Sequence, residues 1–138
     1  MAQRWLFIVY LIGLVTFTES ARADETAIRK SLAAYVEAFN KHDAQAMGKL
    51  WTENGVHRDE VTGEEISGRE AITADLTSVF KDNPKIRLST HLTKLRMIRP
   101  EVARGEGEAT LSGGGEDPSV TRFTVILVLH DGKWLIDS

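Results

Sequence analysis

The stretch AYVEAFNKHDAQAMGKLWTENG, residues 34–55, joins the end of one amphipathic helix to a second, shorter helix. The first helix is expected to begin at Asp24 or Thr26 and to end near Lys41. Asp43 is expected to cap the second helix. Apolar residues recur at intervals of three and four along the first helix, which predicts one buried stripe. The stripe comprises Ile28, Leu32, Tyr35, Val36 and Phe39.

Strand-forming residues dominate the second half of the sequence. Before them, Gly68 precedes a third expected helix. Two long strands are expected at residues 85–98 and 102–112. Asp131-Gly132 lies between two apolar runs, which is typical of a tight β-hairpin. The apolar face expected of the third helix comprises Ile72, Leu76 and Phe80.

The strand FTVILVL, residues 123–129, is apolar on both faces apart from Thr124. One face can pack on the helices, but a domain of this size has no further layer to cover the other face. That second face carries Thr124, Ile126 and Val128. Because a second copy of the chain could cover this apolar face, the sequence predicts a homodimer.

Helices followed by an antiparallel sheet predict an α+β fold. We expect a cone-shaped, curved antiparallel sheet, with the three helices of the N-terminal half packed on its concave face. Three short helices cannot fill such a face completely. A pocket inside the cone is the expected consequence.

Residues 1–23 have the composition of a secretory signal peptide. One basic residue precedes an apolar run at residues 5–17, and Ala21 and Ala23 fit the small-residue subsites of signal peptidase. The run is shorter than the roughly 20 apolar residues of a membrane span. An uncleaved membrane anchor is the alternative. Cleavage would leave a mature domain at residues 24–138 in a secreted or periplasmic protein.

The composition of the mature domain argues against several partners and cofactors. Removing residues 1–23 takes away two basic residues and one acidic residue, which leaves 15 basic and 19 acidic residues. A net charge near −4 argues against nucleic acid and, after signal cleavage, against a membrane surface. The four histidines form no H-x-H or H-E-x-x-H pattern, and cysteine is absent. No metal and no cofactor are therefore expected.

Two segments carry a resemblance to a known family. They are AYVEAFNKHDAQAMGKLWTENGVHRDEVTGEEISGREAI, residues 34–72, and DGKWLIDS, residues 131–138. Together they resemble a SnoaL-like domain of the nuclear transport factor 2 superfamily, in particular the SgcJ/EcaC type, many of whose members are secreted. The similarity extends over residues 24–138. It implies the cone-shaped fold but not a function, because the fold hosts isomerases, cyclases, dehydratases, transport adaptors and binding domains.

Within this superfamily, the ketosteroid isomerases imply roles for three positions. Their oxyanion-hole tyrosine corresponds to Tyr35, and their proton-abstracting aspartate corresponds to Asp59. Their second oxyanion donor, a protonated aspartic acid, falls on or near Val125, whose side chain has no hydrogen-bond donor. The resemblance therefore implies an incomplete steroid-isomerase site.

His57 and Asp59 stand two residues apart in a strand-like stretch, so they are expected to point to the same side. If that side faces the pocket, Asp59 is a candidate general base supported by His57, with Tyr35 as a hydrogen-bond donor. The alternative is that His57 and Asp59 bond to each other and to nearby backbone at the pocket rim. Four further residues are candidates for ligand contact or for the core, namely Trp51, Phe39, Phe80 and Val125.

The sequence leaves the ligand unidentified and three functions open. The first is a domain that binds a small, mostly apolar molecule without transforming it. The second is a cofactor-free isomerase or lyase that uses Asp59 as its base. The third is a protein-association module that uses the sheet face. The sequence also leaves open the dimer geometry and whether the chain continues beyond Ser138.

Overall fold

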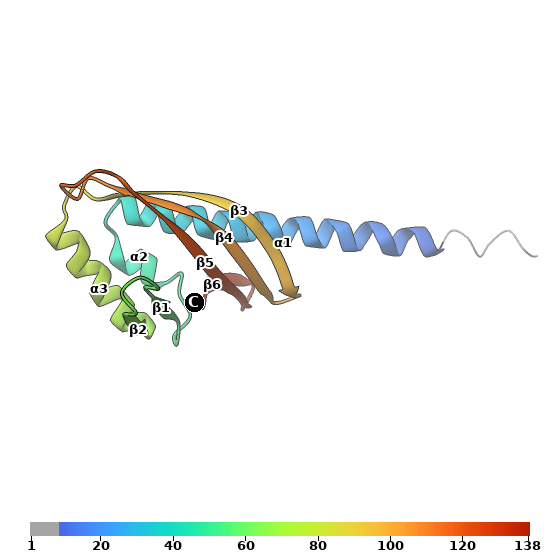
Figure 1. Ribbon diagram of the computed structural model, residues 1–138. Coiled ribbons are helices and arrows are strands. Elements are labelled where there is room, and N and C mark those ends of the chain that lie inside the picture. The colour runs from blue at the N-terminus through green and yellow to red at the C-terminus, as the bar shows by residue number, and fades with distance from the viewer. Residues whose placement is uncertain (1–8) are drawn as a thin grey trace, which may run out of the picture.

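The computed structural model describes residues 9–138, with side chains from Glu19 onward. Its first element is α1 (Val9–Asn40), whose N-terminal part projects beyond the sheet (Figure 1). The helix start predicted at Asp24 or Thr26 is wrong, because both residues lie inside α1. The flanking residues are rich in alanine and charged helix formers and contain no proline, so the helix continues through them. The helix end predicted near Lys41 is confirmed to within one residue.

The predicted signal peptide lies only partly within the described residues. Residues 1–8 fall outside them, and residues 9–23 belong to α1. Cleavage after Ala23 stays a prediction. No helix in the described part of the chain has an apolar stretch long enough to cross a membrane.

α2 (Ala44–Gly48) begins where the sequence predicts it. The Asp43 carboxylate accepts a hydrogen bond from the backbone N–H of Ala46 at 3.0 Å, so Asp43 is the N-cap as predicted. Ala44 and Met47 are buried, so the side of this short helix that carries them faces the core.

α3 (Arg69–Asp82) lies against α2 (Figure 1). A Cβ at Gly48 would lie 2.2 Å from the Thr73 hydroxyl oxygen, so a larger residue here would force the Thr73 side chain to move. The predicted apolar face of α3 is confirmed by the burial of Ile72, Leu76 and Phe80.

The strands form two antiparallel sheets. A small hairpin pairs the first two strands, and the main sheet has the order β3-β4-β5-β6. Asp131 and Gly132 have φ angles of 48° and 74°, so the predicted hairpin turn between β5 and β6 is confirmed. The strands are β1 (Val56–Arg58), β2 (Glu65–Ser67), β3 (Arg87–Arg99), β4 (Val102–Ser112), β5 (Ser119–His130) and β6 (Lys133–Ile136).

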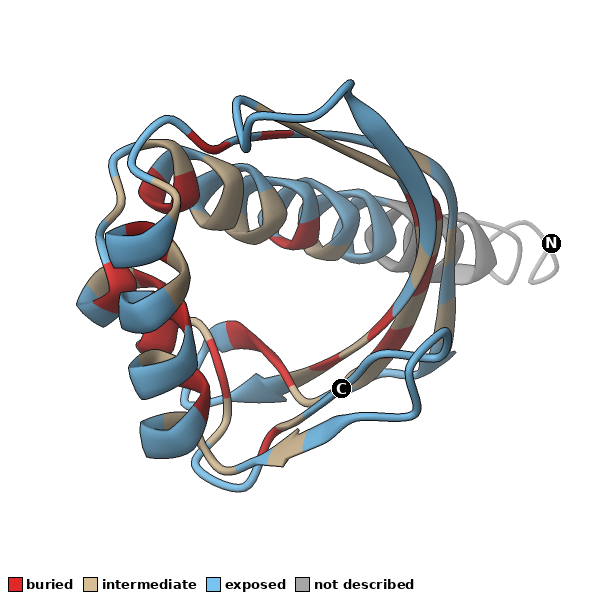
Figure 2. Cartoon of the chain, turned by 60° about the vertical axis from the view of Figure 1, so that its left-hand side comes forward, coloured by how far each residue is buried: buried red, intermediate tan, exposed pale blue. Residues whose placement is uncertain are grey.

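The main sheet is strongly curved, and two features of the chain permit this. The register of β3 against β4 shifts after Leu92 and again after Met97, and such bulges bend a strand. A Cβ at Gly107 would lie 2.3 Å from the His91 carbonyl oxygen, so a glycine is needed where the strands press together. The sheet curves around α1, with α2 and α3 opposite (Figure 2). The predicted α+β cone is therefore confirmed.

The segment after α2 covers the outer edge of β6. Trp51 forms a parallel bridge with Ile136, and the Thr52 N–H donates to the Ile136 carbonyl oxygen at 2.8 Å. The Thr52 hydroxyl also donates to the Asp137 carboxylate at 2.9 Å. These contacts fix the backbone of Trp51 at the edge of the sheet.

The two faces of β5 differ as the sequence predicts. Val125 and Leu127 point to the concave side and are buried. On the convex side Thr124 is exposed, and Ile126 and Val128 are half-buried. The convex face of β5 is therefore incompletely covered within one chain, and the homodimer stays a prediction.

Candidate functional site

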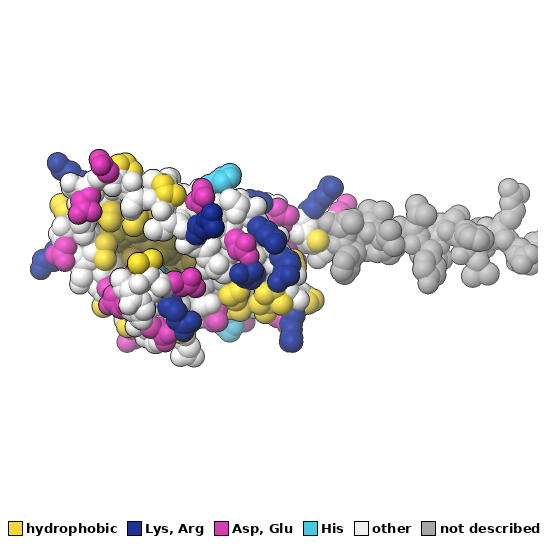
Figure 3. Space-filling view, in the orientation of Figure 1, with side chains coloured by type: hydrophobic (Ala, Val, Ile, Leu, Met, Phe, Trp, Pro, Cys, Tyr) yellow, Lys and Arg dark blue, Asp and Glu magenta, His cyan; other side chains and the backbone are white. Residues whose placement is uncertain are grey.

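A hollow lined with hydrophobic side chains opens on the face of the domain shown in Figure 3. Several apolar side chains packed against the core are only half-buried, including strand residues that point to the concave side of the sheet. Together with the hollow in Figure 3, this half-burial on the concave side indicates that the helices leave the interior of the cone partly open. The half-buried residues include Tyr35, Ile66, Leu95, Met97, Leu111 and Phe123.

Trp51 and Tyr35 are two aromatic side chains of this core that carry hydrogen-bonding groups. Trp51 is 4% exposed, and its indole N–H has no hydrogen-bond partner among the described residues. Burial raises the pKa of the Tyr35 hydroxyl to about 12, and the neighbouring Trp51 indole opposes this shift with a smaller effect. The indole N–H therefore lies beside the Tyr35 hydroxyl, although no hydrogen bond of acceptable geometry joins them.

His57 lies at the rim of the interior, next to Trp51. Its ring centroid is 6.3 Å from that of Trp51, and the rings meet edge to face. Its partner across the hairpin, Ile66, packs against the core, which places this side of β1 and β2 toward the cone. The His57 side chain is nevertheless exposed. His57 thus lies on the side of the hairpin that faces the cone, at its rim, and its predicted role in the pocket stays a prediction.

The prediction that Asp59 lines the pocket is wrong. Because β1 ends at Arg58, the alternation of strand side chains stops before Asp59. Asp59 is exposed, and its carboxylate accepts hydrogen bonds from the backbone N–H groups of Val61 and Thr62 at 2.8 and 3.0 Å. These hydrogen bonds hold the pKa of Asp59 below its usual value. A carboxylate stabilised in its charged form is a poor proton acceptor, so this position does not favour the predicted role as general base.

The other predicted ligand contacts belong to the core. Phe39, Phe80 and Val125 are 6%, 7% and 7% exposed. The Phe39 and Phe80 rings meet edge to face with centroids 5.0 Å apart, and the His42 ring stacks on Phe80 at 4.7 Å. Phe39 and Phe80 therefore pack against each other between α1 and α3, Val125 packs from β5, and all three leave little surface for a ligand.

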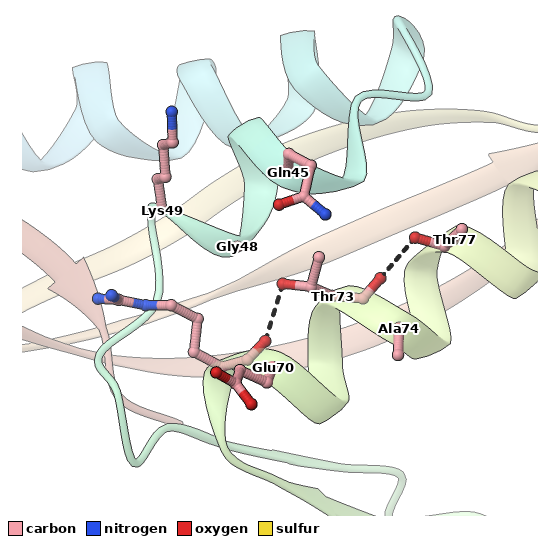
Figure 4. Close-up of a pocket in the computed structure, with 8 residues that line it drawn as sticks. Gln45, Gly48, Lys49, Glu70, Thr73, Ala74 and Thr77 are labelled. Carbon is pink, nitrogen blue, oxygen red and sulfur yellow. Dashed lines mark hydrogen bonds between the residues drawn. The ribbon is translucent and has the colours of Figure 1, made fainter.

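A cleft between α2 and α3 was not predicted from the sequence (Figure 4). Its volume is about 290 Å³. The Thr73 hydroxyl donates to the Arg69 carbonyl oxygen at 2.8 Å, and the Arg69 guanidinium donates to the Trp51 carbonyl oxygen at 2.6 and 2.9 Å. These polar groups are already paired within the protein. The polar residues Arg69, Thr73 and Thr77 recur at four-residue spacing, and this pattern could have indicated a polar helix face here. The cleft is lined by Gln45, Gly48, Lys49, Arg69, Glu70, Thr73, Ala74 and Thr77.

The charges of the described residues limit what the interior can bind. None of the buried residues in this part of the chain is polar or charged by residue type. The described residues, buried or exposed, contain no group of three or more His, Cys, Asp or Glu side chains that could hold a metal ion. A charged ligand would therefore lose its hydration in the interior without gaining a partner of opposite charge.

Comparison with known proteins agrees with this fold. The SnoaL-like domain family matches residues 32–135. Comparison with curated protein sequences gives no match. Among solved structures, an NTF2-like protein of unknown function from Shewanella oneidensis is 19% identical with a TM-score of 0.73, over 83% of this chain and 94% of that chain.

Two further solved structures are similar in fold. A protein assigned as a scytalone dehydratase, from Novosphingobium aromaticivorans, is 14% identical with a TM-score of 0.72, over 87% of this chain and 83% of that one. A ketosteroid isomerase-like protein from Erwinia carotovora atroseptica is 18% identical with a TM-score of 0.68, over 81% and 89% of the two chains. At these identities the similarity concerns the fold alone. With its family match over residues 32–135, the chain belongs to the SnoaL-like domain family.

Proposed function

We propose that the domain binds a small, uncharged, mostly apolar molecule inside the cone. The observation that carries this proposal is the half-buried apolar lining of the concave side. Folding leaves apolar surface exposed inside this concave site. Binding of an apolar ligand is favourable there, because the ligand removes that surface from water. The lack of buried charge in the described residues supports an uncharged ligand.

We do not propose Asp59 as a catalytic base. It lies in the exposed turn after β1, where two backbone N–H groups already bond its carboxylate. The solved neighbours that are named as an isomerase-like protein and a dehydratase share the fold with this chain at 18% and 14% identity. Such similarity supports no particular reaction here.

The binding proposal can be tested with N-phenylnaphthylamine, a neutral fluorophore that brightens in apolar surroundings. Ala109 is half-buried on the concave side of β4, and the next residue, Thr110, is half-buried on the convex side. Ala109→Phe fills part of the interior and should weaken probe binding, whereas Thr110→Phe is the matched control and should not. Thermal melts establish that both variants fold. Equal probe binding by parent and Ala109→Phe would contradict the proposal.

We further propose that the protein is exported and belongs to the SgcJ/EcaC type of secreted SnoaL-like domains. The basic start, the apolar run and the Ala21-x-Ala23 pattern support export. Mass spectrometry of exported protein should give an N-terminus at Asp24. Membrane-bound protein that retains Met1 would contradict this localisation.

A third proposal is a homodimer through the convex face of the sheet. Ile126 and Val128 are half-buried there, and Val102 lies opposite Val128 on the neighbouring strand. Apolar side chains on an uncovered sheet face favour association with a second copy. The oligomeric state of the protein and of an Ile126 variant tests this, as set out below.

A further inference from the structure

We infer that His57 contacts the polar end of the bound molecule, and that this molecule is a neutral alcohol or phenol whose apolar body lies inside the cone. This inference rests on the proposed function and deepens it. The ligand class becomes an apolar molecule with one hydroxyl group, which lies at the rim.

The first step is that a bound molecule can reach His57. The His57 side chain is exposed, and its ring centroid lies 6.3 Å from that of the core residue Trp51. Its partner across the hairpin, Ile66, is half-buried against the core, so this side of the hairpin continues into the apolar lining. A molecule that occupies the hollow and extends to its rim therefore meets the His57 ring (Figure 3).

The second step is the contrast between the rim and the interior. The half-buried lining of the concave side is apolar, as at Leu95 and Phe123. The Tyr35 hydroxyl and the Trp51 indole N–H are buried beside each other, so neither is open to a ligand. A hydroxyl group in this interior would lose its hydrogen bonds to water without a replacement. A ligand with one polar end should therefore bind with its apolar end innermost and its polar end at the rim.

The third step concerns the charge of the polar end. A charged neighbour of His57 is Asp59, whose carboxylate already accepts hydrogen bonds from the backbone N–H groups of Val61 and Thr62. Asp59 would repel an anionic group, and it offers a cationic group only an exposed ion pair, which contributes little. A hydroxyl group avoids both limits. It can donate and accept a hydrogen bond, which matches the two ring nitrogens of a neutral imidazole.

The test combines two probes with one substitution. Methylnaphthol and dimethylnaphthalene, each with its two substituents at opposite ends of the ring system, differ in a single hydroxyl group. Dissociation constants are measured by displacement of N-phenylnaphthylamine. His57→Phe keeps an aromatic ring beside Trp51 and removes the hydrogen-bonding nitrogens. The affinity for methylnaphthol relative to dimethylnaphthalene should fall about fivefold in this variant, the factor that corresponds to one ordinary hydrogen bond.

Two further variants make the result specific. His57→Gln retains a donor and an acceptor and should keep most of the relative affinity for methylnaphthol. His91→Phe is the matched control, because His91 is an exposed histidine on β3 whose strand partner Glu108 precedes the concave-side Ala109. His91 therefore lies on the convex side, and its substitution should leave the relative affinity unchanged. Thermal melts establish that the variants fold.

The outcomes separate this inference from the proposed function. A relative affinity that is unchanged in His57→Phe, or that falls equally in His91→Phe, overturns the inference while the binding function stands. Failure of both probes and of N-phenylnaphthylamine to bind the parent overturns the proposed function itself.

Discussion

Raising the pH through the titration of Tyr35 should destabilise the folded domain by an amount that the structure allows us to calculate. Burial raises the pKa of Tyr35 from 10.0 to about 12. A pKa difference of about two units corresponds to about 2.7 kcal/mol of folding free energy. The neutral phenol is the form that the folded state favours.

The sign follows from proton binding in the two states. Below pH 10 the hydroxyl is protonated in both states, so Tyr35 adds no pH dependence there. Between pH 10.0 and about 12 the unfolded chain loses the proton while the folded domain keeps it. The free energy of unfolding therefore falls across this window, and the loss of about 2.7 kcal/mol is complete above the folded pKa.

The assay combines tyrosinate absorbance with urea unfolding at several pH values. Tyr35→Phe is the reference, because subtracting its pH profile removes the contributions of lysines and of any other tyrosine. The difference in stability between parent and Tyr35→Phe should be constant below pH 10 and should change by about 2.7 kcal/mol above it. A Tyr35 signal that titrates near pH 10 in the folded protein would refute the burial of this hydroxyl.

Three further predictions concern other parts of the domain. Asp59→Asn should leave probe binding unchanged, because the carboxylate lies in an exposed turn; a changed dissociation constant in calorimetry would restore Asp59 to the site. Leu127→Ala should destabilise the domain by about 2–5 kcal/mol in urea unfolding, since Leu127 is 0% exposed. Leu129→Ala on the same strand, 37% exposed, should cost about 1 kcal/mol or less. Ile126→Lys should convert a dimer to monomer or aggregate in light scattering, and a parent that is already monomeric at micromolar concentration would contradict the dimer.

Most of the fold could be predicted because local chemistry determines it. The Asp43 cap, the apolar face of α3 and the Asp131-Gly132 turn each depend on residues that are close in the sequence. The start of α1 could not be predicted in this way. Helix-forming residues continue on both sides of Asp24, so the predicted cleavage site does not coincide with a helix boundary.

The candidate site was predicted only in part. His57 faces the cone because it lies within β1, where the alternation of side chains holds. Asp59 lies one residue beyond the end of β1, and its carboxylate bonds the backbone of the following turn. Aspartate followed by a glycine four residues later is a turn signal, which could have indicated this outcome.

The unpaired N–H of Trp51 could not be predicted from the sequence. Whether a buried donor has a partner depends on side chains from distant elements, here α1 and the edge of β6. Sequence reasoning placed Trp51 among residues for core or pocket, and the structure gives it features of both. Its side chain is 4% exposed, as in a core residue, and its indole N–H has no hydrogen-bond partner among the described residues.

The most direct test of the account is a two-dimensional proton–nitrogen NMR spectrum of the isotope-labelled protein titrated with N-phenylnaphthylamine. The account predicts that saturating probe shifts the backbone N–H signals of residues on the concave side of the sheet, such as Leu95 and Phe123, and leaves the signal of Thr110 on the convex side nearly unchanged. Unmoved concave-side signals at saturation would contradict it.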